Sequence, residues 1–170
     1  MLIAETNRLL ISKITLNDAP FFLELANTPN WLKYIGDRNL KTVKDAKDYL
    51  RKGTLKSYKD HGFGFYKLVL KEKDNTFIGV CGLVKREQLD EVDIGFALLP
   101  EHESKGFGYE ASVAVLKLAK ERFSLKKLVA ITLPINKNSI NLLEKLGFNY
   151  EKKVNPFEDG KELLLFAKSL

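Results

Sequence analysis

The sequence predicts an α+β protein with one domain, residues 1–170, built on a mixed, mostly antiparallel seven-stranded sheet with helices on both faces. Three observations indicate this class. Short apolar segments bounded by turn residues recur in the first 100 residues, and a long helical pattern covers residues 109–123. A nearly continuous apolar segment follows at 127–133, which is typical of a strand buried on both faces. A chain of 170 residues with 45% hydrophobic residues suits one core.

The chain is expected to begin with a strand and two helices. Apolar residues alternate along residues 8–13, which predicts a strand. Residues 18–27 carry apolar side chains at helical spacing, and Thr28-Pro29-Asn30 ends that helix. Residues 31–40 form a loop or short helix with exposed aromatic side chains. Thr42 then caps a second helix that continues to about residue 58.

Three antiparallel strands are expected next. Residues 65–71 and 76–85 form a hairpin that turns at Lys73-Asp74-Asn75. The fourth strand, residues 92–99, leads through a glycine-containing turn into the helix over 109–123.

The last third of the chain alternates strand and helix. The strand at 127–133 precedes a helix over 138–146, and Gly147 ends this helix in the left-handed conformation. Strands at 148–153 and 163–167 complete the sheet.

Composition excludes several function classes. The formal net charge of +6 comes from lysines scattered along the chain, so it does not predict nucleic-acid binding. No apolar segment approaches the roughly 18 residues that span a bilayer, and the first residues do not resemble a signal peptide. Cys81 is the single cysteine, so no internal disulfide forms and a cytoplasmic location is expected. No cluster has metal-ligand spacing, so no metal is expected.

The turn from Glu103 to Gly108 carries the main functional signal. Glycines at 106 and 108 let backbone N–H groups approach a ligand, and a helix N-terminus follows, which favours phosphate. A dinucleotide-binding fingerprint is a poor match, because six residues separate Leu99 from Gly106 and no acidic residue ends the next strand. A nicotinamide-dependent oxidoreductase is therefore the weakest of the functions considered.

The wider pattern resembles the GNAT superfamily of acyl-CoA-dependent N-acetyltransferases. This pattern runs from the strand and x-x-Gly-x-Gly turn to Asn136-x-x-Ser139 and the Leu-Glu-Lys-Leu-Gly-Phe sequence ending at Phe148. Residues 5–11 and Ile94-Gly95-Phe96 are similar to the ribosomal-protein N-acetyltransferase (RimJ/RimL-like) branch. The resemblance implies a GNAT-like fold, acetyl-CoA as co-substrate, and a fourth strand that splays from the fifth.

The resemblance also implies the cofactor contacts. They lie at Glu103, Ser104, Lys105, Gly106, Phe107, Gly108 and Tyr109 in the turn, at Asn136, and at Ala97, Leu98 and Leu99 along the pantetheine arm. A backbone N–H near Leu98 or Leu99 would stabilise the developing oxyanion. Glu103 departs from the family's Gln or Arg, and a carboxylate cannot donate to phosphate. Backbone N–H groups of residues 104–108 must then bind the diphosphate, with help from the Lys105 side chain.

The catalytic residues are less sharply indicated. The acid tyrosine of many family members is replaced by Leu143, whereas Ser139 matches the serine thought to serve in the RimJ/RimL-like branch. Ser139 also fits an ordinary residue of a helix's first turn. Asp93, or Glu91 on the same face, could act as general base, although a solvated strand end is the simpler explanation of both. Cys81 is expected to be a packed, inert thiol.

The acceptor is not named by the sequence. Trp31 and Tyr34 match the region that walls the acceptor site in the family, and they also fit ordinary packing anchors. The expected partner is a primary amine, on a protein N-terminus or a small molecule, and the expected assembly is a monomer or homodimer. The alternative function is a non-catalytic acyl-CoA-binding or sensing module on the same fold.

Overall fold

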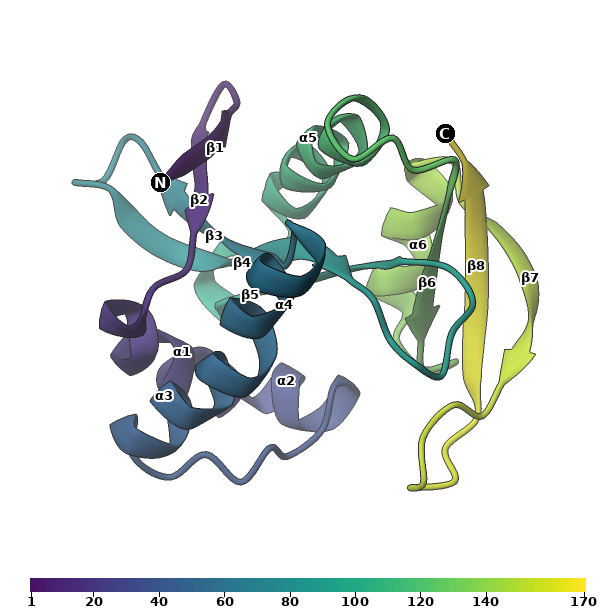
Figure 1. Ribbon diagram of the computed structural model, residues 1–170, viewed down its shortest axis with the longest axis horizontal. Helices are drawn as coiled ribbons and strands as arrows, with labels where there is room; N and C mark the ends of the chain where they lie inside the picture. Colours follow the sequence, from purple (N-terminus) through teal and green to yellow (C-terminus); the bar gives the residue numbers. More distant parts are fainter.

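The computed structural model describes residues 1–170 and has one mixed sheet at its centre (Figure 1). The strands are β1 (Leu2–Glu5), β2 (Leu9–Lys13), β3 (Phe65–Leu70), β4 (Thr76–Val84), β5 (Asp93–Leu98), β6 (Lys127–Thr132), β7 (Asn149–Val154) and β8 (Leu163–Ser169). The helices are α1 (Ala19–Ala26), α2 (Pro29–Tyr34), α3 (Val43–Leu50), α4 (Lys56–His61), α5 (Phe107–Glu121) and α6 (Lys137–Lys145). Within the sheet the strand order is β1-β2-β3-β4-β5-β6-β8-β7.

The sheet has eight strands, so the expectation of seven was wrong by one. The additional strand, β1, pairs antiparallel with β2 and matches Ala4 to Ile11 and Glu5 to Leu10. It has four residues at the edge of the sheet, and Leu2 remains 54% exposed. A segment of this length is too short to show a clear alternation of apolar and polar residues, so the sequence did not predict it as a strand.

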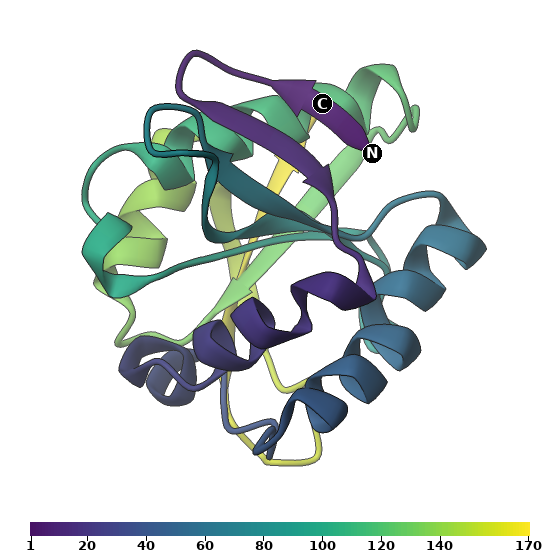
Figure 2. The ribbon, with the colours of Figure 1, turned by 90° about the vertical axis from the view of Figure 1, so that its left-hand side faces the viewer.

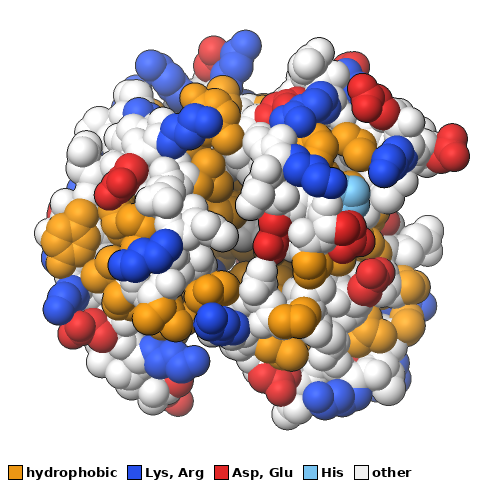
Figure 3. Space-filling model, turned by 180° about the vertical axis from the view of Figure 1, so that it is seen from behind, with side chains coloured by type: hydrophobic (Ala, Val, Ile, Leu, Met, Phe, Trp, Pro, Cys, Tyr) orange, Lys and Arg blue, Asp and Glu red, His pale blue; other side chains and the backbone are white.

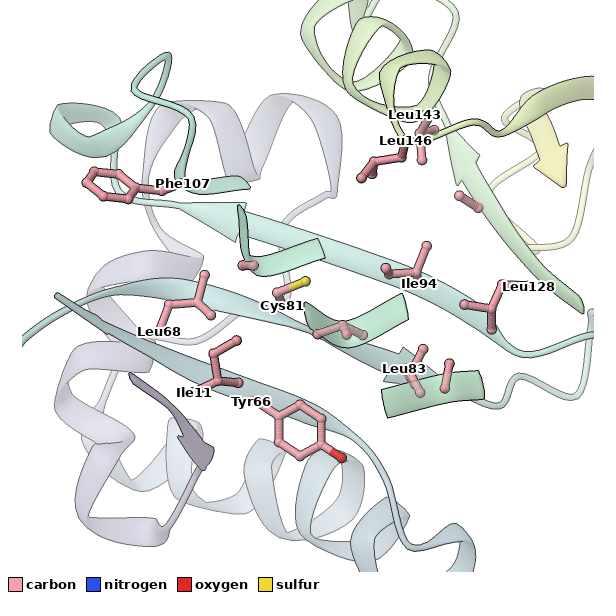
Figure 4. Packing of buried hydrophobic residues seen from close by; sticks show 14 of the residues in the cluster. Ile11, Tyr66, Leu68, Cys81, Leu83, Ile94, Phe107, Leu128, Leu143 and Leu146 are labelled. Atoms are coloured by element: carbon pink, nitrogen blue, oxygen red, sulfur yellow. The ribbon is translucent and has the colours of Figure 1, made fainter. Parts of the chain in front are cut away.

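Helices cover both faces of the sheet, as expected (Figure 2). The larger core cluster joins one face to α5 and α6, and Figure 4 shows Ile11, Leu68, Cys81 and Ile94 packed within it. The second cluster joins the opposite face to α1, α2 and α3. This division follows from the alternation of side chains along each strand.

The ends of the helices follow local sequence signals. Thr42 caps α3, because its hydroxyl accepts from the N–H of Asp45 at 3.1 Å. A π-helical turn at Arg51–Leu55 joins α3 to α4, so the helix expected to end near residue 58 continues to His61. Gly147 follows α6 with φ 88°, and the next N–H donates to Leu143 O at 3.0 Å, which confirms the expected glycine termination.

The sheet opens between β5 and β6. These strands are parallel, and their register contains a single pair, Asp93 with Val129. Beyond this pair β5 remains paired with β4 up to Leu98, whereas β6 remains paired with β8. The fourth and fifth predicted strands correspond to β5 and β6. Their expected splay is therefore confirmed. No helix of the protein has the length and apolar character needed to cross a membrane.

Candidate active site

A large cavity of about 1030 Å³ occupies the opening between β5 and β6. Its lining comes from β5, the starts of α5 and α6, α2, the α3–α4 region and the β7–β8 loop. The face seen in Figure 3 is hollowed between the two halves of the molecule, with hydrophobic side chains at depth. The cavity therefore lies where the strands separate and reaches solvent.

The turn before α5 forms a cradle of backbone N–H groups. Ser104 has φ 58° and Gly106 has φ 84°, so the chain enters the left-handed region twice before the helix begins. None of the six N–H groups from Ser104 to Tyr109 donates a hydrogen bond to another group of the protein. The first N–H groups of a helix have no acceptor within the helix, and six adjacent free donors at a helix N-terminus favour an anion. This arrangement fits a diphosphate.

Close packing explains the second glycine of the turn. A Cβ on Gly108 would lie 3.3 Å from Cδ2 of Leu142 on α6, so the absence of a side chain lets α5 and α6 approach. Tyr109 lines the cavity one residue later, whereas the Phe107 side chain is buried in the core and the Lys105 side chain is exposed. Phe107 and Lys105 thus contribute backbone N–H groups to the cradle.

Glu103 is directed away from the cradle. Both of its carboxylate oxygens lie 2.9 Å from Nδ2 of Asn30 on α2. The contact connects the turn before α5 to the wall formed by α2. It gives Glu103 a structural partner at the position where the family resemblance implies a phosphate contact.

Leu98 provides a free backbone donor near the end of β5. The N–H of Leu99 donates to Ile78 O at 2.9 Å, on the β4 side. Backbone groups alternate in direction along a strand, so those of Ala97 also face β4 and those of Leu98 face the opening. The expectation that Ala97 and Leu99 offer backbone groups along the opening was therefore wrong, and Leu98 is the available oxyanion donor of the two considered.

Asp93 lies at the point where β5 and β6 separate. It is 1% exposed, and Oδ2 accepts from Nε of Arg86 at 2.7 Å, whereas Oδ1 has no hydrogen-bond partner. Burial raises the pKa of Asp93 above its ordinary value, against the attraction of Arg86. The solvated strand end considered from the sequence was wrong. Glu91 does not line the cavity, so Asp93 is the remaining base candidate of the two.

The start of α6 brings two expected residues to the cavity. Oδ1 of Asn136 accepts from the N–H of Ser139 at 3.2 Å and caps the helix, which leaves the amide nitrogen of Asn136 without a partner. Ser139 lines the cavity, and its hydroxyl makes no hydrogen bond within the protein. Leu143, at the position of the family's tyrosine, is 1% exposed and belongs to the core (Figure 4).

Residues 29–34 form the short helix that was one of the two expected alternatives, but Trp31 and Tyr34 are not the exposed aromatic side chains expected there. Pro29 is the first residue of α2, and Trp31 is 6% exposed and packs edge-on against Phe22 at 5.7 Å between centroids. Both Trp31 and Tyr34 line the cavity, and Nε1 of Trp31 has no hydrogen-bond partner. Trp31 is therefore both a packing anchor and part of the wall.

Three basic residues of the site were missed from the sequence. Arg86 contacts Asp93, and Lys145 places Nζ 4.5 Å from the centroid of the Tyr109 ring, beside the cradle. Arg8 donates from Nη1 to Lys105 O at 2.9 Å beneath the turn. Lysine and arginine are common on any surface, so no sequence signal separated these three from the others. No group of three or more His, Cys, Asp or Glu side chains is placed to hold a metal ion.

Comparison with known proteins identifies the family. A model of the acetyltransferase (GNAT) domain matches residues 8–149. The chain belongs to the GNAT acetyltransferase family. This GNAT N-acetyltransferase is 29% identical over 161 residues to an uncharacterised N-acetyltransferase, p20, of Bacillus licheniformis, which covers 94% of the chain and 89% of that protein.

Ribosomal-protein acetyltransferases are among the relatives. The uS5-alanine N-acetyltransferase of Escherichia coli (strain K12) is 26% identical over 103 residues, or 59% of this GNAT chain and 53% of the E. coli protein. The solved structure of RimL, a ribosomal-protein α-N-acetyltransferase in complex with coenzyme A, superposes with a TM-score of 0.82 at 14% identity. It covers 100% of this chain and 98% of RimL, and it shows that the fold is shared.

Proposed function

We propose that this enzyme transfers acetyl from acetyl-CoA to a primary amine by direct attack within a ternary complex. The observation that carries the proposal is the run of six unpartnered N–H groups from Ser104 to Tyr109, beside a strand opening that exposes Leu98. The family uses acetyl-CoA, whose thioester supplies the activated acyl group. The cradle holds the diphosphate, and the opening between β5 and β6 accommodates the pantetheine arm.

Each chemical requirement of the transfer has one residue in this proposal. The N–H of Leu98 donates to the thioester oxygen as negative charge develops there. Asp93 takes a proton from the attacking amine, directly or through water, because its raised pKa makes it a better proton acceptor near neutrality than an ordinary carboxylate. Ser139 donates a proton to the leaving sulfur and regains one from solvent, to which Asp93 releases the proton taken from the amine. Asn136, with its free amide nitrogen, contacts the cofactor beside Ser139.

The acceptor class in the proposal is a primary amine on a protein N-terminus or a small molecule. The relationship to a ribosomal-protein N-acetyltransferase supports the first choice. Trp31 and Tyr34 form the wall against which the acceptor packs. The single, unpaired Cys81 and the use of acetyl-CoA are consistent with a cytoplasmic enzyme.

Two measurements test the proposal. Calorimetric titration with coenzyme A and acetyl-CoA is expected to show one site per chain, and absence of binding to both would exclude it. Incubation with acetyl-CoA and a panel of amines and N-terminal peptides is expected to give thiol release and a gain of one acetyl group by mass spectrometry. Cofactor binding without turnover on any acceptor would support the non-catalytic acyl-CoA-binding module instead.

A further inference from the structure

Arg8 lies beneath the cradle and contacts it at several points. Nη1 donates to Lys105 O at 2.9 Å, and Nε donates to Oε2 of Glu110 at 2.7 Å. The backbone N–H of Arg8 donates to the other carboxylate oxygen of Glu110 at 2.8 Å, across 102 positions of the chain. A planar guanidinium makes such divergent contacts at once, which a lysine ammonium cannot reproduce.

The bond to Lys105 fixes the direction of the next N–H group. No peptide bond of the protein is cis, so Lys105 O and the Gly106 N–H point in opposite directions. Because Arg8 holds the oxygen, the Gly106 N–H points away from Arg8. A Cβ on Gly106 would lie 3.2 Å from Nη2 of Arg8, which shows how closely the guanidinium packs under this residue.

Arg8 also orders the first residue of α5. Its Cζ lies 4.2 Å from the centroid of the Phe107 ring, and Phe107 is 6% exposed within the core. Cation–π contact of this kind adds to the hydrogen bonds. The guanidinium therefore contacts Lys105 and Phe107 and lies under the Gly106 between them, and the N–H groups of all three residues are without partners in the protein.

Charge provides an independent argument. Glu110 lies in the first turn of α5, where its carboxylate would repel an anion bound at the helix N-terminus. Arg8 pairs with this carboxylate, which also accepts from Oγ1 of Thr6 at 2.6 Å. The ion pair therefore removes most of the unfavourable charge from beneath the cradle.

We infer that Arg8 is a positioning residue for the diphosphate of the co-substrate. It turns the Gly106 N–H outward, packs against Phe107 and neutralises Glu110 beneath the cradle. The inference rests on the proposed binding of acetyl-CoA, and it assigns to residues before β2 a part in cofactor affinity. Arg8 need not touch the ligand to have this effect.

The test compares Arg8→Met with the wild type for two ligands, coenzyme A and pantetheine, which lacks the diphosphate and nucleotide. The Kd for coenzyme A is expected to rise about tenfold, because the Gly106 N–H is no longer held toward the diphosphate and the Glu110 carboxylate is left unpaired. Affinity for pantetheine is expected to stay within twofold. Arg51→Met, which removes an exposed pair with Asp48, is the matched control and should change neither value.

Two further variants separate charge from geometry. Arg8→Lys keeps the charge but loses the planar guanidinium with its several N–H donors. Its Kd for coenzyme A should therefore lie between those of wild type and Arg8→Met. In the double variant Arg8→Met/Glu110→Gln, removal of the repulsive carboxylate should recover part of the affinity.

Three outcomes would overturn the inference. The first is a folded Arg8→Met protein with unchanged Kd for coenzyme A. The second is equal weakening of pantetheine, which would indicate general damage to the site. The third applies if Arg8→Met does not fold, and it is a Kd for coenzyme A in Arg8→Lys equal to that of the wild type. Failure of the wild type itself to bind coenzyme A would instead remove the proposed function.

Discussion

Glu103 and Asn30 are in direct contact in the cavity wall, with both carboxylate oxygens of Glu103 2.9 Å from Nδ2 of Asn30. Glu103 belongs to the turn before α5, and Asn30 belongs to α2, the helix that carries Trp31. A carboxylate beside a proposed diphosphate is electrostatically unfavourable. The contact with Asn30 directs Glu103 toward α2 and gives it a role in holding that wall.

Replacement of Glu103 by glutamine tests the cost of this charge. Glu103→Gln can still accept from Asn30 and loses one negative charge near the cradle, so we expect coenzyme A to bind about threefold to tenfold more tightly at low salt. The gain should shrink as salt screens the charge. Titration at two salt concentrations measures both effects. Glu101→Gln, an exposed residue just before the turn, is the control, and an identical gain there would show a non-specific charge effect.

Gly106 offers a test of the backbone conformation of the cradle and of the packing of Arg8 against it. Gly106→Asp places a side chain 3.2 Å from Nη2 of Arg8, at φ 84°, and adds negative charge beneath the ligand. We expect the Kd for coenzyme A to rise by at least about tenfold. Gly160→Asp carries a similar backbone penalty at φ 72°, in an exposed loop with nothing within 4 Å of the added Cβ, and serves as the control. Equal affinities in the two variants would contradict the cradle.

Asp93 should control the pH dependence of turnover. The base acts when ionised, and burial raises its pKa, so the rate should fall as pH decreases through that raised value. Asp93→Asn should lower kcat by about 10²-fold and abolish this acidic limb. Arg86→Gln removes the attraction that favours the ionised form, so the limb should move to higher pH. A pH–rate profile on any accepted amine measures these changes.

Glu91→Gln provides the control for Asp93, because Glu91 does not line the cavity. An Asp93→Asn enzyme with wild-type kcat and an unchanged profile would show that proton removal occurs elsewhere. The rate acceleration would then come mainly from the positioning of the two substrates in one complex.

Local patterns predicted the elements better than they predicted the site. The strand before the turn and the helix after it follow from apolar periodicity, and Gly106 and Gly147 both have the positive φ that glycine favours. The burial of Asp93 and the Arg8–Glu110 pair depend on segments brought together by the register of the sheet. Arg8 and Glu110 are 102 positions apart in the sequence, so no local signal indicates the pair.

Cys81 should be unreactive in the folded protein. The thiol is fully buried in the core (Figure 4), and burial raises its pKa to about 12, so almost no thiolate is present near neutrality. We expect no reaction with a disulfide reagent such as DTNB in buffer and one reactive thiol per chain in denaturant. Rapid stoichiometric labelling of the native enzyme would contradict the packing of β4 against α5.

Ser139→Ala tests whether the Ser139 hydroxyl acts as a general acid or is only an ordinary residue of the first turn of α6. The α6 cap is made by the Ser139 N–H and Oδ1 of Asn136, so loss of the hydroxyl should leave the cap and the thermal midpoint nearly unchanged. If Ser139 protonates the leaving sulfur, kcat should fall by about 10²-fold while the Kd for acetyl-CoA changes little. Ser57→Ala is a suitable comparison, because that hydroxyl bonds to Phe63 O and should affect stability more than turnover. A normal kcat in Ser139→Ala would mean that the thiolate leaves without help from this side chain.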